Sequence, residues 1–176
     1  MAKRWFTSDT HFGHTNIIRY ARGQFPHVDV MDTALINNWN SLVGDEDEVF
    51  HLGDFCWPKK PDPYLFRLKG KLHLIVGNHD HRHVRTHPRW LSVTPFLELS
   101  VGHGLTLCHY ALEVWNKSHW GSFHLHGHSH GSLPARGRRM DVGVDPLSFF
   151  PVEEAAVVEK LKAIAVQTPD HHKERR

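Results

Sequence analysis

The chain has 176 residues, a formal net charge of +2 and 23% charged residues, and that length suits one domain with a single sizeable core. Hydrophobic residues make up 40% of the chain, which excludes the composition of a disordered protein. The sequence has no apolar run long enough to cross a bilayer, and its near-neutral charge does not identify a nucleic-acid-binding protein.

Short apolar runs separated by amphipathic stretches predict alternating strands and helices. The predicted strands are residues 4–8, 48–52, 71–76, 96–101, 105–109, 123–126 and 139–144. The predicted helices are residues 30–43, 63–68 and 151–166. Residues 102–104, Gly-His-Gly, separate two of the strands and predict a hairpin.

The helix predicted over residues 30–43 has Asp29 as its N-terminal cap and ends at Gly44. The side chains expected on its buried face are Met31, Leu35, Trp39 and Leu42. The helix predicted over residues 151–166 has a proline in its first turn and charges that complement the helix dipole. We therefore expect one domain over residues 1–167, followed by a polar, flexible tail over residues 168–176.

Histidine is unusually frequent, with 18 residues in the chain, and neutral imidazole is the commonest metal ligand in proteins. The N-terminus lacks the apolar segment of an export signal, so a cytoplasmic location is expected. The two cysteines, Cys56 and Cys108, are too few for a disulfide framework and are expected to be free, buried thiols, as suits a reducing cytosol.

Five of the predicted strands end directly in polar clusters. The clusters are Asp9-Thr10-His11, Gly53-Asp54, Gly77-Asn78-His79-Asp80, His109 and Gly127-His128-Ser129-His130. In open α/β sheets, ligands bind beyond the carboxyl ends of the strands. The five clusters are therefore expected to converge on one rim.

These clusters contain the residue types that two neighbouring divalent cations need, including a carboxylate able to bridge them. The seven candidate ligands are Asp9, His11, Asp54, Asn78, His109, His128 and His130. Residues two apart on an extended chain point to the same side, so each Asp-x-His or His-x-His pair is expected to face one metal region. The glycines that precede three of the ligands permit tight turns and close approach of the backbone.

The order Asp-x-His, Gly-Asp, Gly-Asn-His-Asp, His, Gly-His-x-His resembles the motif set of the calcineurin-like metallophosphoesterase superfamily, and it extends from Asp9 to His130. Residues 8–14, Ser-Asp-Thr-His-Phe-Gly-His, and residues 16–18, Asn-Ile-Ile, resemble small, compact bacterial and phage members. The resemblance implies an α/β fold: a two-sheet β-sandwich flanked by helices, a four-layer arrangement with the site at the loop rim.

The resemblance also implies a role for each motif residue. It assigns the first metal to Asp9, His11 and His130. It assigns the second metal to Asn78, His109 and His128, with Asp54 bridging both. A hydroxide between the metals would attack phosphorus in line. His79 would contact the leaving oxygen, and Asp80 would orient His79 through its other ring nitrogen.

Further side chains could contact the substrate. His14 could approach the substrate or a metal ligand, or could instead cap the segment 16–20. Arg82, Arg138 and Arg139 could bind phosphate, although for each of them alone a place in a solvated loop is favoured. Trp115 and Trp120 could stack on a base, but packing in the core or anchoring of a loop is favoured. No long insertion separates the motifs, so the site is expected to be open, without a cap domain.

The sequence therefore predicts a binuclear metal-dependent phosphoesterase, either a phosphodiesterase or a phosphatase, that acts on nucleotide-like substrates. Two divalent ions are the expected cofactors, with manganese favoured and iron, zinc, nickel and cobalt left open. The expected partner is a phosphoester, and no membrane is involved. A nuclease acting on DNA or RNA is a narrower alternative. A metal-binding module or a nucleic-acid-binding module, each without catalysis, is the alternative of another class.

Overall fold

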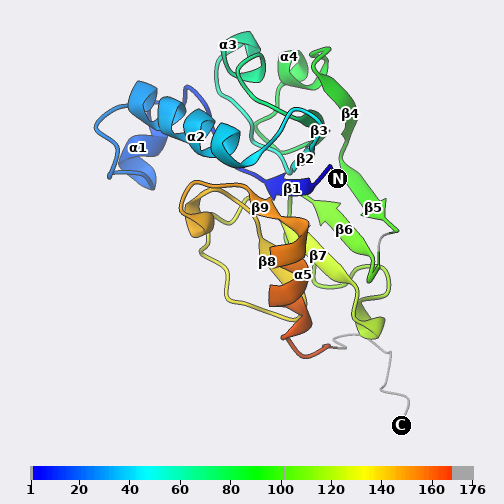
Figure 1. Ribbon diagram of the computed structural model, residues 1–176. Coiled ribbons are helices and arrows are strands. Elements are labelled where there is room, and N and C mark those ends of the chain that lie inside the picture. Colours follow the sequence, from blue (N-terminus) through cyan, green and yellow to red (C-terminus); the bar gives the residue numbers. More distant parts are fainter. Residues whose placement is uncertain (1, 101, 168–176) are drawn as a thin grey trace.

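The computed structural model describes residues 2–100 and 102–167. Its core is two β-sheets placed face to face, with helices at the outside (Figure 1). The five strands of the larger sheet are β4 (Trp90–Thr94), β3 (Lys71–Ile75), β2 (Glu48–His51), β1 (Arg4–Thr7) and β9 (Val152–Glu153), in that spatial order. The four strands of the smaller sheet are β5 (Phe96–Leu99), β6 (Leu105–Cys108), β7 (Phe123–His126) and β8 (Arg139–Asp141).

Strand direction determines where the polar clusters go. Strands β1 to β4 are mutually parallel, and so are β6, β7 and β8. Because each sheet has a parallel core, the carboxyl ends of its central strands meet at one edge. The antiparallel pair β5–β6 confirms the predicted hairpin. β4 and β5 follow one another around Pro95, so one extended segment forms an edge of both sheets (Figure 1).

In the described part of the chain, five helices accompany the sheets: α1 (Ile17–Tyr20), α2 (Val28–Leu42), α3 (Asp62–Leu65), α4 (Arg82–Arg85) and α5 (Glu154–Lys162). The same residues also form two short 3-10 helices, η1 (Ser118–Trp120) and η2 (Asp145–Leu147). The predicted two-sheet fold with flanking helices is confirmed.

On the outer side of β7, His124 is covered by a loop, because the backbone N–H of Leu112 donates to its Nε2 over 3.0 Å and the ring of Trp115 lies against it.

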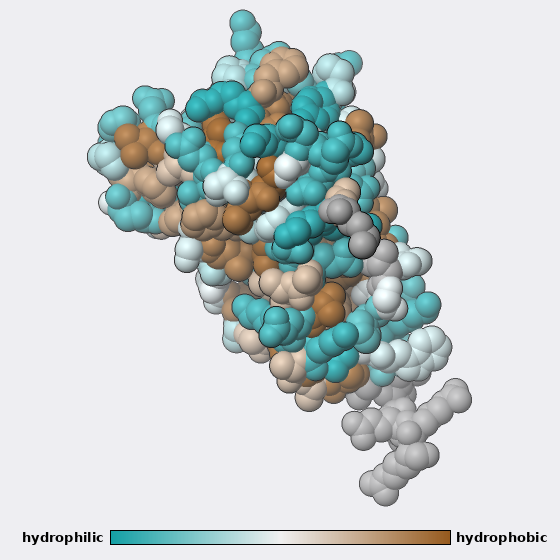
Figure 2. All heavy atoms as spheres, in the orientation of Figure 1, coloured by the Kyte–Doolittle hydropathy of each residue, from teal (hydrophilic) through white to brown (hydrophobic). Residues whose placement is uncertain are grey.

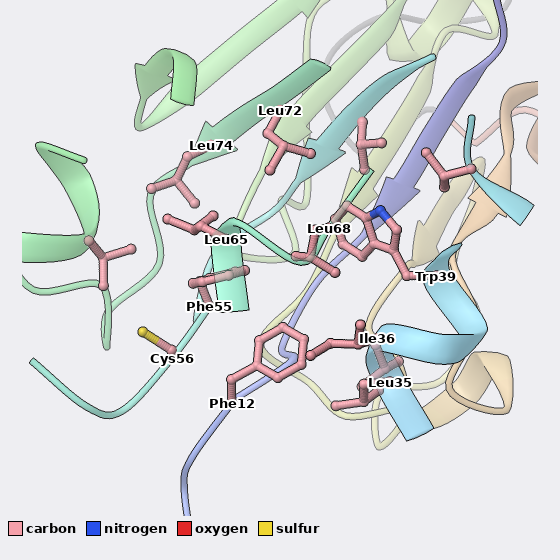
Figure 3. Packing of buried hydrophobic residues seen from close by; sticks show 14 of the residues in the cluster. Phe12, Leu35, Ile36, Trp39, Phe55, Cys56, Leu65, Leu68, Leu72 and Leu74 are labelled. Carbon is pink, nitrogen blue, oxygen red and sulfur yellow. The ribbon is translucent and has the colours of Figure 1, made fainter. Parts of the chain in front are cut away.

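Two hydrophobic clusters lie on opposite faces of the larger sheet. The first joins that sheet to α1–α4 and includes Trp39, Val49 and Leu74. The second fills the space between the sheets and includes Phe6 and Leu107, with residues of α5. Figure 3 shows residues of the first cluster, with Phe12 pointing toward Leu35 and Ile36 of α2.

This packing matters for the site, because Phe12 follows His11 and Phe55 follows Asp54. Both phenylalanines are fully buried in the first cluster. Each buried ring contributes about 2–3 kcal/mol relative to an exposed one, so the polar loops are held by anchors inside the core.

Helix α2 is longer at its start than predicted. It begins at Val28 after His27, and neither His27 nor the predicted cap Asp29 forms a side-chain capping hydrogen bond. Met31, Leu35 and Trp39 are buried as expected, but Leu42 is 44% exposed. The prediction for Leu42 was wrong because Trp39 and Val43, four residues apart, take the inward-facing positions at this end of the helix, so Leu42 faces outward.

The last predicted helix is replaced in part by a strand. Val152 and Glu153 pair with β1 as β9, and α5 begins only at Glu154. The predicted proline in the first turn therefore precedes a strand, because pairing with β1 satisfies the backbone there. The predicted tail, residues 168–176, lies outside the described residues.

Figure 2 shows hydrophilic residues over much of one face of the molecule, with apolar residues between them in small groups. Within residues 2–100 and 102–167, no helix is both long and apolar enough to span a membrane.

Cys56 and Cys108 are free, and Cys56 is buried as predicted, whereas Cys108 is only partly buried.

Candidate metal centre

The loops after β1 and β7 bring together one group of possible metal ligands. Asp9, His11 and His130 each place a ligand atom within 4.8 Å of the others. Asp9 Oδ1 lies 3.9 Å from His11 Nε2 and 4.0 Å from His130 Nε2. Asp9 Oδ1 and His11 Nε2 are both buried without a hydrogen-bond partner. Buried polar atoms are normally paired, and a cation would satisfy both of these.

A second group lies beside the first. Asp54, His109 and His128 follow β2, β6 and β7, and their ligand atoms also lie within 4.8 Å of one another. Asp54 Oδ2 is 3.6 Å from His109 Nε2 and 3.7 Å from His11 Nε2 of the first group. One carboxylate oxygen therefore faces both groups, as a bridging ligand must.

Asn78 belongs with the second group. Its Oδ1 lies 3.0 Å from His109 Nε2 and 3.1 Å from His128 Nδ1. The side-chain oxygen of Asn78 thus points at the same space as the two imidazoles. All seven predicted ligands converge on one site, and their oxygen and imidazole donors fit a pair of divalent cations.

The backbone at this site is not extended. Five of the seven residues have positive φ angles: Asp9 (56°), His11 (48°), Asp54 (57°), His128 (65°) and His130 (47°). Such conformations are uncommon for residues with a side chain and concentrate at functional sites. They also correct the extended-chain argument, because His128 and His130 fall in different groups although only one residue separates them.

Two glycines make this convergence sterically feasible. A Cβ atom on Gly77 would collide with the carboxylate of Asp54, and one on Gly127 would collide with Ser8 and the carboxylate of Asp9. The chain comes this close only where glycine stands, as the sequence predicts.

Burial controls protonation in the first group. Burial raises the pKa of Asp9 to about 7 and lowers the pKa of His11 to about 2. Burial also lowers the pKa of His128. His11 and His128 are therefore neutral and able to bind a cation near neutral pH, while the buried Asp9 carboxylate needs a positive partner.

Two residues that were not predicted support His130. Asp145 of η2 lies with Oδ2 2.7 Å from His130 Nδ1. The fully buried Arg22 donates to both carboxylate oxygens of Asp145 over 2.9 Å, and it also donates to the backbone carbonyls of Asp9 and Thr10. The hydrogen bond between His130 Nδ1 and the Asp145 carboxylate orients the His130 ring so that its Nε2 faces Asp9.

The electrostatics of this pair agree with its geometry. The hydrogen bond that His130 Nδ1 donates to the Asp145 carboxylate raises the pKa of His130. Burial raises the pKa of Asp145, but the hydrogen bonds and charges of His130 and Arg22 outweigh it and hold that pKa well below its usual range. Asp145 follows β8, so its place at a strand end was a usable signal, whereas Arg22 had none.

The predicted contact between Asp80 and His79 is absent from the described part of the chain. The fully buried Asp80 carboxylate instead accepts hydrogen bonds from the backbone N–H groups of Asp54, Phe55 and Gly77, at 2.8 to 3.0 Å. Asp80 therefore ties the loop of β2 to the loop of β3. The prediction was wrong because unpaired backbone donors in both loops compete for the same carboxylate.

His79 itself lies at the site. Its ring centroid is 5.7 Å from that of His11, and its backbone N–H donates to Asp54 Oδ1 over 2.8 Å. The ring of His14 is 5.6 Å from that of His11. Helix α1 has no side-chain cap, so His14 does not cap it and instead faces the site.

Two of the three predicted phosphate contacts are used elsewhere. The guanidinium of Arg138 donates to the carbonyls of Gly121, Lys162 and Ile164 at 2.8 to 3.3 Å. Arg139 donates to the carbonyl of Leu112 over 3.1 Å. Both arginines lie at the start of β8, opposite the rim, so these predictions were wrong. Arg82 is exposed at the start of α4, and its role stays a prediction.

Arg138→Ala should therefore destabilise the protein by about 1–3 kcal/mol, because three carbonyls lose a charged donor and the guanidinium over the Phe123 ring is lost. The KM for a phosphoester should stay within about twofold of the parent's, since the side chain is remote from the site. Urea unfolding and steady-state kinetics would measure both. A raised KM with unchanged stability would show that Arg138 contacts the substrate.

Trp115 and Trp120, the two tryptophans considered as stacking residues, have different surroundings in the structure. Trp115 donates through Nε1 to the carbonyl of Ser122 over 3.2 Å and anchors its loop, as favoured. Trp120 is 74% exposed, so packing in the core is wrong for it. It precedes β7, whereas the site follows β7, so Trp120 stands at the other end of that strand from the candidate metal centre.

Asp32 of α2 holds the loop that carries His11 and His14. Both of its carboxylate oxygens lie 3.1 Å from the backbone N of Gly13. Burial raises the pKa of Asp32 from 3.8 to about 6. A carboxyl group whose folded pKa is raised stabilises the fold at low pH, and that stability is lost as the pH rises through the folded value.

Asp32→Asn should remove this dependence while keeping an acceptor for Gly13. The stability of the parent relative to the variant should fall by about 1 kcal/mol between pH 5 and pH 7.5. Urea unfolding of both metal-free proteins across that range measures the difference. A difference that does not change with pH would show that Asp32 ionises normally in the fold.

Comparison with known proteins shows which family this chain belongs to. The family model for calcineurin-like phosphoesterases matches residues 2–154. The chain belongs to the calcineurin-like phosphoesterase family. The matched region contains all seven residues of the two groups as well as His79.

Individual relatives extend this result. The chain is 44% identical over 84 residues to the uncharacterized protein MJ1445 of Methanocaldococcus jannaschii, a match that covers 46% of this chain and 48% of that protein. It is 28% identical to the Gene 66 protein of Mycobacterium phage D29, covering 82% of this chain and 89% of that one. The chain spans less than half the length of two of the curated relatives it matches.

Among solved structures, a protein of unknown function, AQ665 from Aquifex aeolicus, superposes with a TM-score of 0.73. The two chains are 22% identical, and the match covers 91% of this chain and 100% of that one. At this identity the similarity establishes the fold alone.

Proposed function

We propose that this calcineurin-like phosphoesterase hydrolyses phosphodiesters of nucleotide type with two divalent cations held by the seven converging residues. The observation that carries the proposal is the Asp54 carboxylate, which faces His11 and His109 at 3.7 and 3.6 Å. Bound divalent cations supply Lewis acidity and an activated water at neutral pH. Manganese is the metal we expect, since mixed oxygen and imidazole donors suit it.

The chain's own residues bind and orient the reacting groups. Asp9, His11 and His130 surround one position, and Asn78, His109 and His128 surround the other. The Asp145–Arg22 pair fixes the ring of His130. His79 stands beside the first position, where its ring nitrogens can give a proton to the departing oxygen.

The charges around the site favour a diester over a monoester. A monoester carries a second negative charge that usually needs a further cation. Among the described arginines near the rim, Arg22 is buried against Asp145 and Arg85 donates to the carbonyl of Asp80, which leaves the exposed Arg82 at the start of α4 for contact with a phosphate. Arg138 and Arg139 lie at the opposite end of β8. The singly charged diester needs no such partner.

The test is hydrolysis of bis-para-nitrophenyl phosphate and of the matching monoester by metal-free protein before and after addition of Mn2+. We expect activity only after the metal is added, with the diester hydrolysed faster. A higher rate on the monoester would replace the diesterase by a phosphatase. A preparation with two bound metals per chain and no hydrolysis of either ester would contradict the proposal.

A nuclease is the second candidate. The exposed Arg82 begins α4, three residues after His79, where it could contact a neighbouring phosphate of a polymer. Incubation of the Mn2+-loaded protein with single-stranded and duplex DNA tests this candidate. Shortened strands would support it, whereas intact DNA under conditions that hydrolyse the small diester would restrict the activity to small substrates.

A further inference from the structure

An exposed tryptophan borders the candidate metal centre on the side of His79. The ring centroid of Trp57 is 4.2 Å from that of His14, with an angle of 6° between the planes, so the two rings are stacked. The same Trp57 ring is 5.5 Å from the ring of His79. Trp57 nevertheless keeps 46% of its surface exposed.

The backbone holds this ring in a fixed place. The N–H of Trp57 donates to the carbonyl of Phe12 over 2.9 Å, and the N–H of Phe12 donates to the carbonyl of Phe55 over 3.0 Å. Phe12 and Cys56 form an isolated parallel bridge. The loops after β1 and β2 are thus paired like strands, and Trp57 extends from that pair.

Packing in the core does not explain the position of the Trp57 side chain. Trp5, Trp39 and Trp90 are buried in the first hydrophobic cluster, as large apolar rings usually are. Trp57 leaves that cluster although Phe55 and Cys56 beside it belong to it. Its ring is instead ordered by His14 and lies beside the space in which a leaving group would meet His79.

We infer that Trp57, ordered by His14, forms a stacking subsite for a planar aromatic group, a nucleobase in particular, on the leaving side of the phosphoester. This inference rests on the proposed function and names its substrate class. Stacking needs only a planar π face on the ligand, so the subsite would accept different bases. Trp57 would act as a specificity-determining residue for phosphoesters that carry a base.

The test compares two anions that differ only in the base. Deoxyadenosine 5′-monophosphate and 2-deoxyribose 5-phosphate are used as competitive inhibitors of bis-para-nitrophenyl phosphate hydrolysis by the Mn2+-loaded full chain. Stacking on one ring is worth about 1–3 kcal/mol, so the nucleotide should bind roughly 5- to 150-fold more tightly than the sugar phosphate.

Three variants identify the residue responsible. Trp57→Ala should reduce the preference for the nucleotide to less than about threefold, whereas Trp57→Phe should retain most of it. Trp120→Ala removes an exposed tryptophan at the other end of β7 and should keep the parent's preference. A Trp57→Ala protein with the parent's preference, or a parent without any preference, would overturn the inference.

The two proposals fail in different ways. Hydrolysis of the reporter diester without a preference for the nucleotide would leave the proposed function intact and remove the subsite. Absence of hydrolysis would remove the proposed function. Binding of both anions can be titrated by calorimetry without turnover, so the preference and its loss in Trp57→Ala remain measurable in that case.

Discussion

Asp54→Asn should lower the turnover of a phosphodiester by at least about 1,000-fold. The substitution removes the charge of the one carboxylate whose Oδ2 faces both groups, at 3.7 Å from His11 Nε2 and 3.6 Å from His109 Nε2. Stabilisation by a bound metal is worth several kcal/mol, and about 4 kcal/mol corresponds to a 1,000-fold change in rate.

The asparagine keeps the shape and the oxygen that accepts the backbone N–H of His79 at 2.8 Å, so the fold should survive. Metal analysis of the purified variant, alongside steady-state kinetics, should show fewer than two ions per chain. Asp47→Asn is the matched control. This buried carboxylate accepts from Trp5 Nε1 at the opposite end of β2, and its loss should lower stability while turnover stays near the parent's. An Asp54→Asn protein with full metal content and normal turnover would disprove the bridging role.

His79→Ala should produce the second largest effect, and its size should depend on the leaving group. Removing a positioned proton donor typically costs about 100- to 10,000-fold. We expect a loss in that range for a diester that releases an alkoxide, which needs a proton. The loss should be less than about tenfold for one that releases para-nitrophenolate, because that anion leaves without protonation.

Steady-state kinetics on the two diesters measure this difference, and the metal content should not change, since His79 is outside both ligand groups. His81→Ala, an exposed histidine two residues further on, is the matched control. Equal losses on both substrates would remove the proton-donor role from His79. Unchanged turnover with the metals bound would show that the assignment of a catalytic role to His79 is wrong.

The sequence predicted the seven converging residues because each stands at the end of a strand. A strand end can be read from a short apolar run followed by Gly, Asp, Asn or His, and parallel pairing then brings such ends together. The order of the pieces, and their resemblance to one family, made the two-sheet fold predictable as well. The assignment of these residues to metals stays a prediction.

The contacts around the ligands were harder to predict, because they depend on tertiary competition. Asp80 was expected to meet the neighbouring His79 ring, but three backbone donors from two loops take its carboxylate. Arg22 is buried against Asp145, and 123 residues separate the two along the chain. No local pattern marks such a pair.

Two further differences have local causes. The spacing argument for His128 and His130 assumed extended chain, whereas both have positive φ angles and point to different groups. Arg138 was a possible phosphate contact in the sequence, but β8 begins at Arg139 and places Arg138 opposite the rim. The direction of each strand determines which residues lie at the rim and which lie at the opposite end of the sheet, and a sequence pattern does not give that direction.

The most direct test of the metal centre is diffraction at the manganese absorption edge from crystals of the chain grown with Mn2+. We expect two anomalous peaks about 3.5–4 Å apart, one on each side of the Asp54 carboxylate, with one among Asp9, His11 and His130 and the other among Asn78, His109 and His128. A single peak, or peaks that lie away from Asp54 at saturating Mn2+, would contradict the account.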